Sequence, residues 1–217
     1  MSFSHFFQQL YTLGYDIHIV VADDRAGIKQ ALGKVFPHAL LQICHNHYLE
    51  NIRMHLRIRT EERYRYFFHS LRLHVFTEGR DTESIERGLA HVFEHHALSS
   101  PKLQDILWDI KHRSDVLFAY LKRRGCPNNT NLIELYNSHL NGRLKTIKGF
   151  QSFQSAERWL NAYLVRRRTK PLTDCEGKFR YLNKHCSLEF TIKKQALWPE
   201  ILTKLGVKMV SFFEKIA

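Results

Sequence analysis

The chain has 217 residues, of which 44% are hydrophobic, and a formal net charge of +12. This length allows one sizeable core, or one domain that carries a large insertion. The sequence predicts neither a membrane-spanning helix nor a signal peptide, because no apolar run approaches roughly 20 residues and the N-terminus lacks the basic and then apolar pattern of a signal peptide. The four cysteines form no CxxC pair, which predicts an intracellular, reducing setting; they are Cys44, Cys126, Cys175 and Cys186.

The positive charge is concentrated in one part of the chain. Residues 1–52 have a net charge of −1, whereas residues 141–194 have a net charge of +9. A basic stretch favours a polyanionic partner, because neutralising phosphates releases condensed counterions. This distribution predicts a nucleic-acid track beside a core with acidic residues, rather than a membrane surface patch. The expected phosphate contacts are Arg143, Lys145, Lys148, Arg158, Arg166, Arg167, Arg168 and Lys170.

The first 43 residues predict a βαβ unit that follows an N-terminal helix. Apolar residues at helical spacing predict a helix over residues 3–13, which Gly14 ends. Residues 17–21 form a short β-branched run and predict a buried strand. A helix is expected over residues 27–36, before Pro37, and a second strand over residues 40–43. Strand, helix and strand in so short a span imply neighbouring parallel strands.

The rest of the chain has a helical pattern. Residues 44–124 predict about four helices, with breaks near residues 78–79 and 98–101. Further helices are expected from about residue 131, over residues 155–168 and over residues 195–217. The expected fold class is therefore α/β, with a large all-helical insertion and a basic helical C-terminal flank.

Three groups of residues are candidates for chemistry. Asp23 follows the first strand, Cys44 and His47 follow the second, and Glu134 lies in the first turn of a later helix. The carboxyl ends of parallel strands converge at one edge of an open sheet. Carboxylates that converge on one point are what phosphoryl transfer by two hard cations requires.

Each carboxylate also has a structural interpretation. Asp23 and Asp24 are of a type that often caps the helix that follows, a role worth about 1 kcal/mol. Asn131 and Glu134 have the spacing of a capping box, in which the glutamate accepts from a backbone amide.

The cysteine and the histidine have alternatives as well. Cys44 is of a type that is often a small buried apolar residue. Three positions apart on a helix, Cys44 and His47 share a face and can share a metal ion, although two ligands do not complete a zinc site.

The combination of motifs resembles the Mutator-like family of DDE DNA transposases. The resemblance rests on Asp23-Asp-Arg-Ala-Gly27, Phe36-Pro37 and Cys44-His-Asn-His47, and then on Asn129-Thr-Asn-Leu-Ile-Glu134 and Lys148-Gly-Phe150. It implies that Asp23 and Glu134 are catalytic ligands of Mg²⁺ or Mn²⁺, and that Cys44 and His47 are the family's Cys-x-x-His pair.

The resemblance also implies a domain organisation and a fold. Residues 1–47 correspond to part of an RNase H-like α/β core, and residues 48–127 to a helical insertion. Residues 128–170 return to the core with the glutamate helix. Residues 171–217 lie beyond the resemblance, which spans roughly residues 1–170, and are expected to form a basic helical tail without an assigned role. The expected fold is thus a partial RNase H-like fold.

In complete members of the family, a first catalytic aspartate lies on an earlier strand. Asp16 cannot replace it, because seven strand residues would separate Asp16 from Asp23 by about 23 Å. We therefore expect a truncated or split transposase, with the missing segment supplied in cis or in trans.

The expected function is metal-dependent DNA cleavage and strand transfer in DNA transposition. The expected partner is double-stranded DNA, both transposon ends and target, and a homo-oligomer is compatible with this function. Two alternatives remain from the sequence: a catalytically inactive DNA-binding remnant, and a small interaction protein stabilised by zinc at Cys44 and His47.

Overall fold

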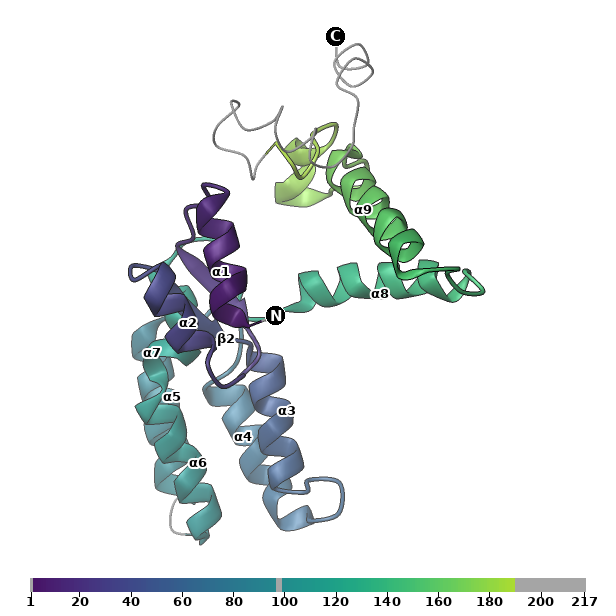
Figure 1. The fold of residues 1–217 in the computed structure, drawn as a ribbon. Coiled ribbons are helices and arrows are strands. Elements are labelled where there is room, and N and C mark those ends of the chain that lie inside the picture. The colour runs from purple at the N-terminus through teal and green to yellow at the C-terminus, as the bar shows by residue number, and fades with distance from the viewer. Residues whose placement is uncertain (1, 97–98, 190–217) are drawn as a thin grey trace. The chain divides into compact units, whose positions relative to one another are not determined.

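The computed structural model describes residues 2–96 and 99–189. The chain divides into two compact units, Met1–His139 and Leu140–Ala217, and each is described by itself (Figure 1). The described residues are mostly helical, with a small parallel sheet, which confirms the α/β class. The helix expected over residues 195–217 lies outside the described residues.

The first unit begins with the expected βαβ arrangement. Helix α1 (Phe3–Thr12) precedes strand β1 (Ile19–Ala22), helix α2 (Ile28–Val35) and strand β2 (Leu40–Ile43). The strands pair in parallel, with Ile19 opposite Leu40 and Ala22 opposite Ile43. Helices α1 and α2 share a small core with partly buried residues of both strands; its buried members are Phe7, Ile28, Ala31, Leu32 and Phe36.

A helical segment follows the second strand. Its longer helices are α3 (His45–His55), α4 (Arg65–His74), α5 (Thr82–His96) and α6 (Pro101–His112), in agreement with the expected number and breaks. Short helical turns connect them to the sheet and to one another: η1 (Glu62–Tyr64), α7 (Ser114–Leu117) and η3 (Ala119–Lys122).

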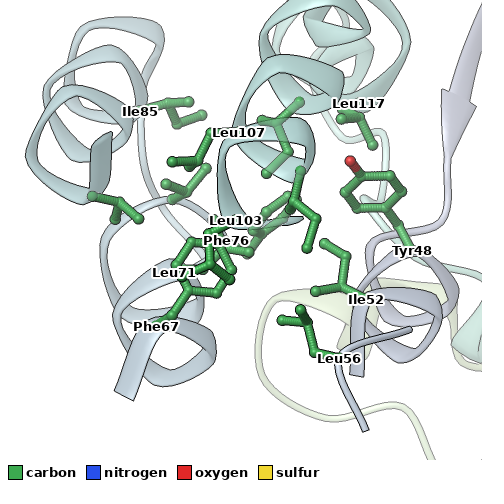
Figure 2. Packing of buried hydrophobic residues seen from close by; sticks show 14 of the residues in the cluster. Tyr48, Ile52, Leu56, Phe67, Leu71, Phe76, Ile85, Leu103, Leu107 and Leu117 are labelled. Carbon is green, nitrogen blue, oxygen red and sulfur yellow. The ribbon is translucent and has the colours of Figure 1, made fainter. Parts of the chain in front are cut away.

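The apolar residues of this segment form the main core of the first unit. Tyr48, Ile52 and Leu56 recur at every fourth position of α3, so they share one face of the helix. Figure 2 shows these residues in one cluster with Phe67 and Leu71 and with side chains of α5, α6 and α7. Burying one side chain of this size contributes about 1.5–3 kcal/mol. The core extends to Ile43 of β2, so it fixes the strand that leads into the candidate site.

Two further helices follow the helical segment. Helix α8 (Asn131–Lys145) begins in the first unit, and helix α9 (Phe153–Thr169) belongs to the second. Helix α9 starts two residues before the expected position because Ser152 and Ser155 form a reciprocal capping box at its N-terminus. The short helix η4 (Gly177–Leu182) and bridges between residues 171–172 and 183–186 complete the second unit as described.

No helix within the described ranges is long and apolar enough to cross a membrane. The domain boundaries expected at residues 47, 127 and 170 stay predictions. The same holds for the relation of the sheet to an RNase H-like fold.

Candidate metal centre at the carboxyl end of the sheet

The two parallel strands bring three candidate residues to one edge of the sheet. Asp23 directly follows β1, and Cys44 directly follows β2. The Cys44 amide donates to the Ala22 carbonyl at 2.8 Å, which continues the pairing of the strands up to the site. Cys44 is the N-cap of α3, so His47 lies in the first turn of that helix.

Helix α8 supplies the second carboxylate. Just before α8, the Asn128 carbonyl accepts from the backbone amide of His45 at 2.9 Å. The Asn46 side-chain amide donates to the Asn131 side chain at 2.7 Å. These bonds hold the start of α8 against the start of α3, and Glu134 lies in the first turn of α8.

His47 lies between the two carboxylates. Its Nδ1 is 2.9 Å from Asp23 Oδ1 and 3.8 Å from Glu134 Oε1. The sum of these distances is the largest separation that the two oxygens can have, and it is below the about 10 Å expected of ligands to a pair of metal ions. The structure thus brings Asp23 and Glu134 together, as expected from the motifs. All three side chains are between 40% and 51% exposed, so solutes can reach them.

Thr130 connects the members of the cluster, and the sequence analysis did not single it out. Its hydroxyl donates to Glu134 Oε1 at 2.6 Å, and it lies 3.2 Å from Cys44 Sγ and 3.4 Å from His47 Nδ1. The Thr130 amide also donates to Cys44 Sγ at 3.3 Å. The sequence offered one signal for this role: Thr130 directly precedes the first residue of the predicted helix that carries Glu134.

The cluster shifts the ionisation of its own members. The pKa of His47 is raised, chiefly by its hydrogen bond with Cys44; burial opposes this effect, and the charges of Asp23, Cys44 and Glu134 raise the pKa further. Burial by itself would raise the pKa of Cys44, but hydrogen bonds from Thr130 and His47 outweigh it, and the pKa is lowered. A lowered thiol pKa favours the thiolate, which is the form that binds metal ions.

The capping interpretations of the acidic residues are wrong. The N-cap of α2 is Gly27, in the left-handed conformation with φ +86°, and no side chain caps that helix. Asp24 instead pairs with Arg113 at 2.6 Å. Glu134 accepts from the Thr130 hydroxyl, and Asn131 lies inside α8 rather than at its N-cap. Nor is Cys44 a purely apolar residue, although it is fully buried, because the Thr130 backbone amide donates to its sulfur.

A polar network beside the site joins the sheet to the helical segment. Arg113 contacts Asp24 and, at 3.5 Å, Asp109, while the Tyr48 hydroxyl donates to Asp109 at 2.6 Å. Burial and the Asp109 carboxylate raise the pKa of Tyr48 above its usual range. The Asp24 carboxylate is thus engaged by Arg113, whereas the Asp23 carboxylate contacts His47.

Gln42 is a second positioning residue that the sequence analysis did not identify. It is fully buried on β2, and its amide nitrogen donates to the carbonyls of Ile43 and Leu117, each at 2.7 Å. Its amide oxygen accepts from the Tyr120 amide at 2.8 Å. Gln42 thereby ties the end of β2 to α7 and η3.

The expected DNA contacts lie in α8, in α9 and in the residues beside them, all within the second unit. Seven of the eight side chains are exposed, and Arg168 is partly buried. The Arg168 carbonyl accepts from the Leu188 amide at 3.1 Å, so this residue also has a structural role.

Three residues of the cluster, Cys44, His47 and Glu134, are close enough to bind one metal ion together. Ligand atoms of Cys44, His47 and Glu134 all lie within 4.8 Å of one another. Thiolate and imidazole are ligands that zinc prefers, while the carboxylates of Asp23 and Glu134 suit a hard cation such as Mg²⁺.

The sheet and the cluster at its carboxyl edge define an α/β protein with a site suited to metal ions. A family model described as transposase, Mutator family, matches residues 1–170. The chain belongs to the Mutator family of transposases. No curated protein matches it at the sequence level.

Proposed function

We propose that the chain acts in DNA transposition by metal-dependent cleavage and strand transfer, with Asp23 and Glu134 as ligands of Mg²⁺ or Mn²⁺. The observation that carries this proposal is that both carboxylates lie within 3.8 Å of one nitrogen, His47 Nδ1, at the edge of a parallel sheet. Bound divalent cations would stabilise the attacking and leaving oxygens of a phosphodiester. The family membership supports DNA as the substrate.

The residues around the carboxylates have separate roles in this proposal. Thr130 fixes Glu134 through its hydroxyl. The raised pKa of His47 favours its protonated form beside Asp23 and Glu134. A divalent cation bound by Asp23 and Glu134 would disfavour the protonated form of His47. Metal binding should therefore release protons from His47.

Two carboxylates hold Mg²⁺ weakly, because this ion dehydrates reluctantly and needs well-placed oxygen ligands. Asp24 and Asp16 do not add to the pair, since Asp24 binds Arg113 and Asp16 contacts His18 and His38. We therefore include in the proposal a further acidic ligand from another transposase segment, in cis or in trans. The same proposal includes an RNase H-like core. The two-stranded sheet formed by β1 and β2 would be one part of that core.

The metal site is tested by Mn²⁺ titration, with free Mn²⁺ followed by electron paramagnetic resonance. Asp23→Asn and Glu134→Gln should each weaken binding by about tenfold or more. Asp105→Asn is the matched control, because Asp105 is an exposed acidic residue of α6. Equal affinity in the wild type, Asp23→Asn and Glu134→Gln would reject the metal site.

The reaction is tested by nicking of supercoiled plasmid with Mg²⁺ or Mn²⁺. We expect the chain alone to leave the plasmid intact, and nicking to appear when a segment with the further acidic ligand is added. Nicking by the chain alone that disappears in Glu134→Gln would show that the site needs no further acid. DNA binding without metal binding or nicking in any combination would instead support an inactive DNA-binding remnant.

Zinc at Cys44, His47 and Glu134 is a second candidate for the same cluster. It is favoured by the convergence of their ligand atoms and by the lowered pKa of Cys44. One equivalent of zinc in the purified protein, lost in Cys44→Ser, would support a zinc-stabilised structure.

A further inference from the structure

A second cluster of metal-ligating side chains lies at the opposite end of the sheet. Asp16 and His18 come just before β1, and His38 lies in the turn between α2 and β2. Their ligand atoms all lie within 4.8 Å of one another. With about 3.3 Å per strand residue, the four-residue strands place this cluster roughly 13 Å from the Asp23 edge. The two clusters are therefore separate sites.

Both imidazoles face the same carboxylate. His18 Nε2 is 3.1 Å from Asp16 Oδ2, and His38 Nε2 is 3.3 Å from Asp16 Oδ1. On a tetrahedral zinc ion, with bonds of about 2.0–2.1 Å, neighbouring ligand atoms lie about 3.3 Å apart. Each imidazole nitrogen already has this spacing to a different oxygen of Asp16, and one ligand atom of each residue lies within 4.8 Å of the others. An ion can therefore bind after side-chain movements that bring both nitrogens toward one oxygen.

The backbone around the cluster holds the ligands in place. The His18 carbonyl accepts from the Leu40 amide at 2.9 Å, which ties it to the first residue of β2. The ring of His38 meets the edge of the Phe36 ring, with 6.4 Å between centroids, and Phe36 is buried in the small core. The ligands thus come from two segments, the loop before β1 and the turn before β2, that the fold itself brings together.

We propose that Asp16, His18 and His38 bind a divalent transition-metal ion of the zinc class. Two imidazoles and one carboxylate leave a fourth position for water, and they favour Zn²⁺, Co²⁺ or Ni²⁺ over Mg²⁺. The ion connects the loop before β1 to the turn before β2. A two-stranded sheet is marginally stable by itself, so this connection stabilises the strand pair that also carries Asp23 and Cys44. The inference does not depend on the proposed reaction.

The test uses Co²⁺ and the whole chain in a Cys44→Ser background, which removes the thiolate of the other cluster. Absorption should show one equivalent of Co²⁺ without a thiolate charge-transfer band. Asp16→Asn and His38→Ala should each weaken the binding by at least about tenfold. His55→Ala is the matched control, because His55 is an exposed histidine of α3.

Thermal unfolding gives a second measurement on the same proteins. Zn²⁺ should raise Tm in the Cys44→Ser background and in the His55→Ala control, since an ion that binds only the folded chain stabilises it. This rise should disappear with Asp16→Asn, and Mg²⁺ at the same concentration should have no such effect. The proposal would be overturned if the Cys44→Ser protein did not bind Co²⁺. It would also be overturned if adding Asp16→Asn or His38→Ala left the affinity for Co²⁺ unchanged.

Discussion

At the scale of single residues, buried polar side chains decide how the site is held. Thr130 and Gln42 are both buried, and each bonds to segments distant in the sequence. A buried polar group that loses its partner costs more than a typical hydrogen bond contributes. These two residues therefore link the local geometry of the site to the stability of the first unit.

The substitution Gln42→Leu should reduce the free energy of unfolding by about 1–3 kcal/mol, because the Tyr120 amide then lacks its acceptor. The measurement is urea unfolding followed by circular dichroism. Gln104→Leu is the control, since Gln104 is exposed on α6, and it should stay within about 0.5 kcal/mol of the wild type. Equal effects of the two substitutions would contradict a positioning role for Gln42.

His96 should make the stability depend on pH. It is buried at the end of α5, beside the rings of Tyr66 and Phe67, and burial lowers its pKa, with smaller contributions from His95 and His91. The unfolded chain then binds a proton that the folded chain excludes. The stabilisation is complete above the unfolded pKa of about 6.5 and is lost as the pH falls through the lowered folded pKa.

The expected result is a fall in the free energy of unfolding between about pH 7 and pH 5 that is smaller in His96→Leu. His112→Leu, at an exposed position of α6, should keep the wild-type pH dependence. Urea unfolding at a series of pH values measures the three slopes. An unchanged slope in His96→Leu would show that His96 does not titrate differently in the folded state.

At the scale of elements, the contact between α4 and α5 depends on a glycine. A Cβ added at Gly88 would lie 1.9 Å from the carbonyl oxygen of His74, which is a backbone atom and cannot move aside as a side chain does. Helix α5 therefore approaches the end of α4 more closely than any larger residue allows. No local pattern around Gly88 signals this, because the contact is made by a helix elsewhere in the chain.

Gly88→Ala should destabilise the first unit by about 1–3 kcal/mol or more, because the two helices must separate. Gly33→Ala is the matched control. Gly33 is exposed in α2 with no atom within 4 Å of the added Cβ, so alanine there should stabilise by about 0.4–1 kcal/mol. Thermal unfolding of both variants gives the comparison, and a neutral or stabilising Gly88→Ala would refute the close approach.

At the scale of the whole molecule, the uneven charge distribution predicts how the protein binds DNA. The basic residues of the second unit are largely exposed, whereas the acidic residues of the candidate site belong to the first unit. Phosphate neutralisation by such residues gives affinity that depends strongly on salt and weakly on sequence.

Charge reversal at Arg166 and Arg167 should weaken duplex binding with little regard to sequence. The log–log salt dependence should become shallower, by up to about 0.9 per lost phosphate contact. Arg168 is left unchanged because it is partly buried. The control is Arg63→Glu with Arg87→Glu, which makes the same change in net charge at exposed positions of the first unit. Fluorescence anisotropy at several salt concentrations measures the slopes, and equal slopes in wild type and Arg166/Arg167 variant would argue against this DNA track.

The sequence alone was sufficient for the elements and their order. The βαβ unit, the helical segment and the existence of α9 follow from local periodicity and from punctuation by Gly14, Pro37 and Pro101, which act within a few residues. The pairing of Asp23 with a glutamate more than a hundred positions later came from the order of the motifs. The periodicity of apolar residues does not indicate which distant residues lie close together.

Only the tertiary structure decided which polar groups meet. That Asp24 binds Arg113, that Thr130 contacts Cys44 and Glu134, and that Asp16 lies between His18 and His38 are consequences of how strands and helices pack. An aspartate after a strand looks alike in the sequence whether it caps a helix, pairs with an arginine or faces a metal. The choice depends on which side chain the fold places within about 3 Å of it, and hydrogen bonds act only at that range.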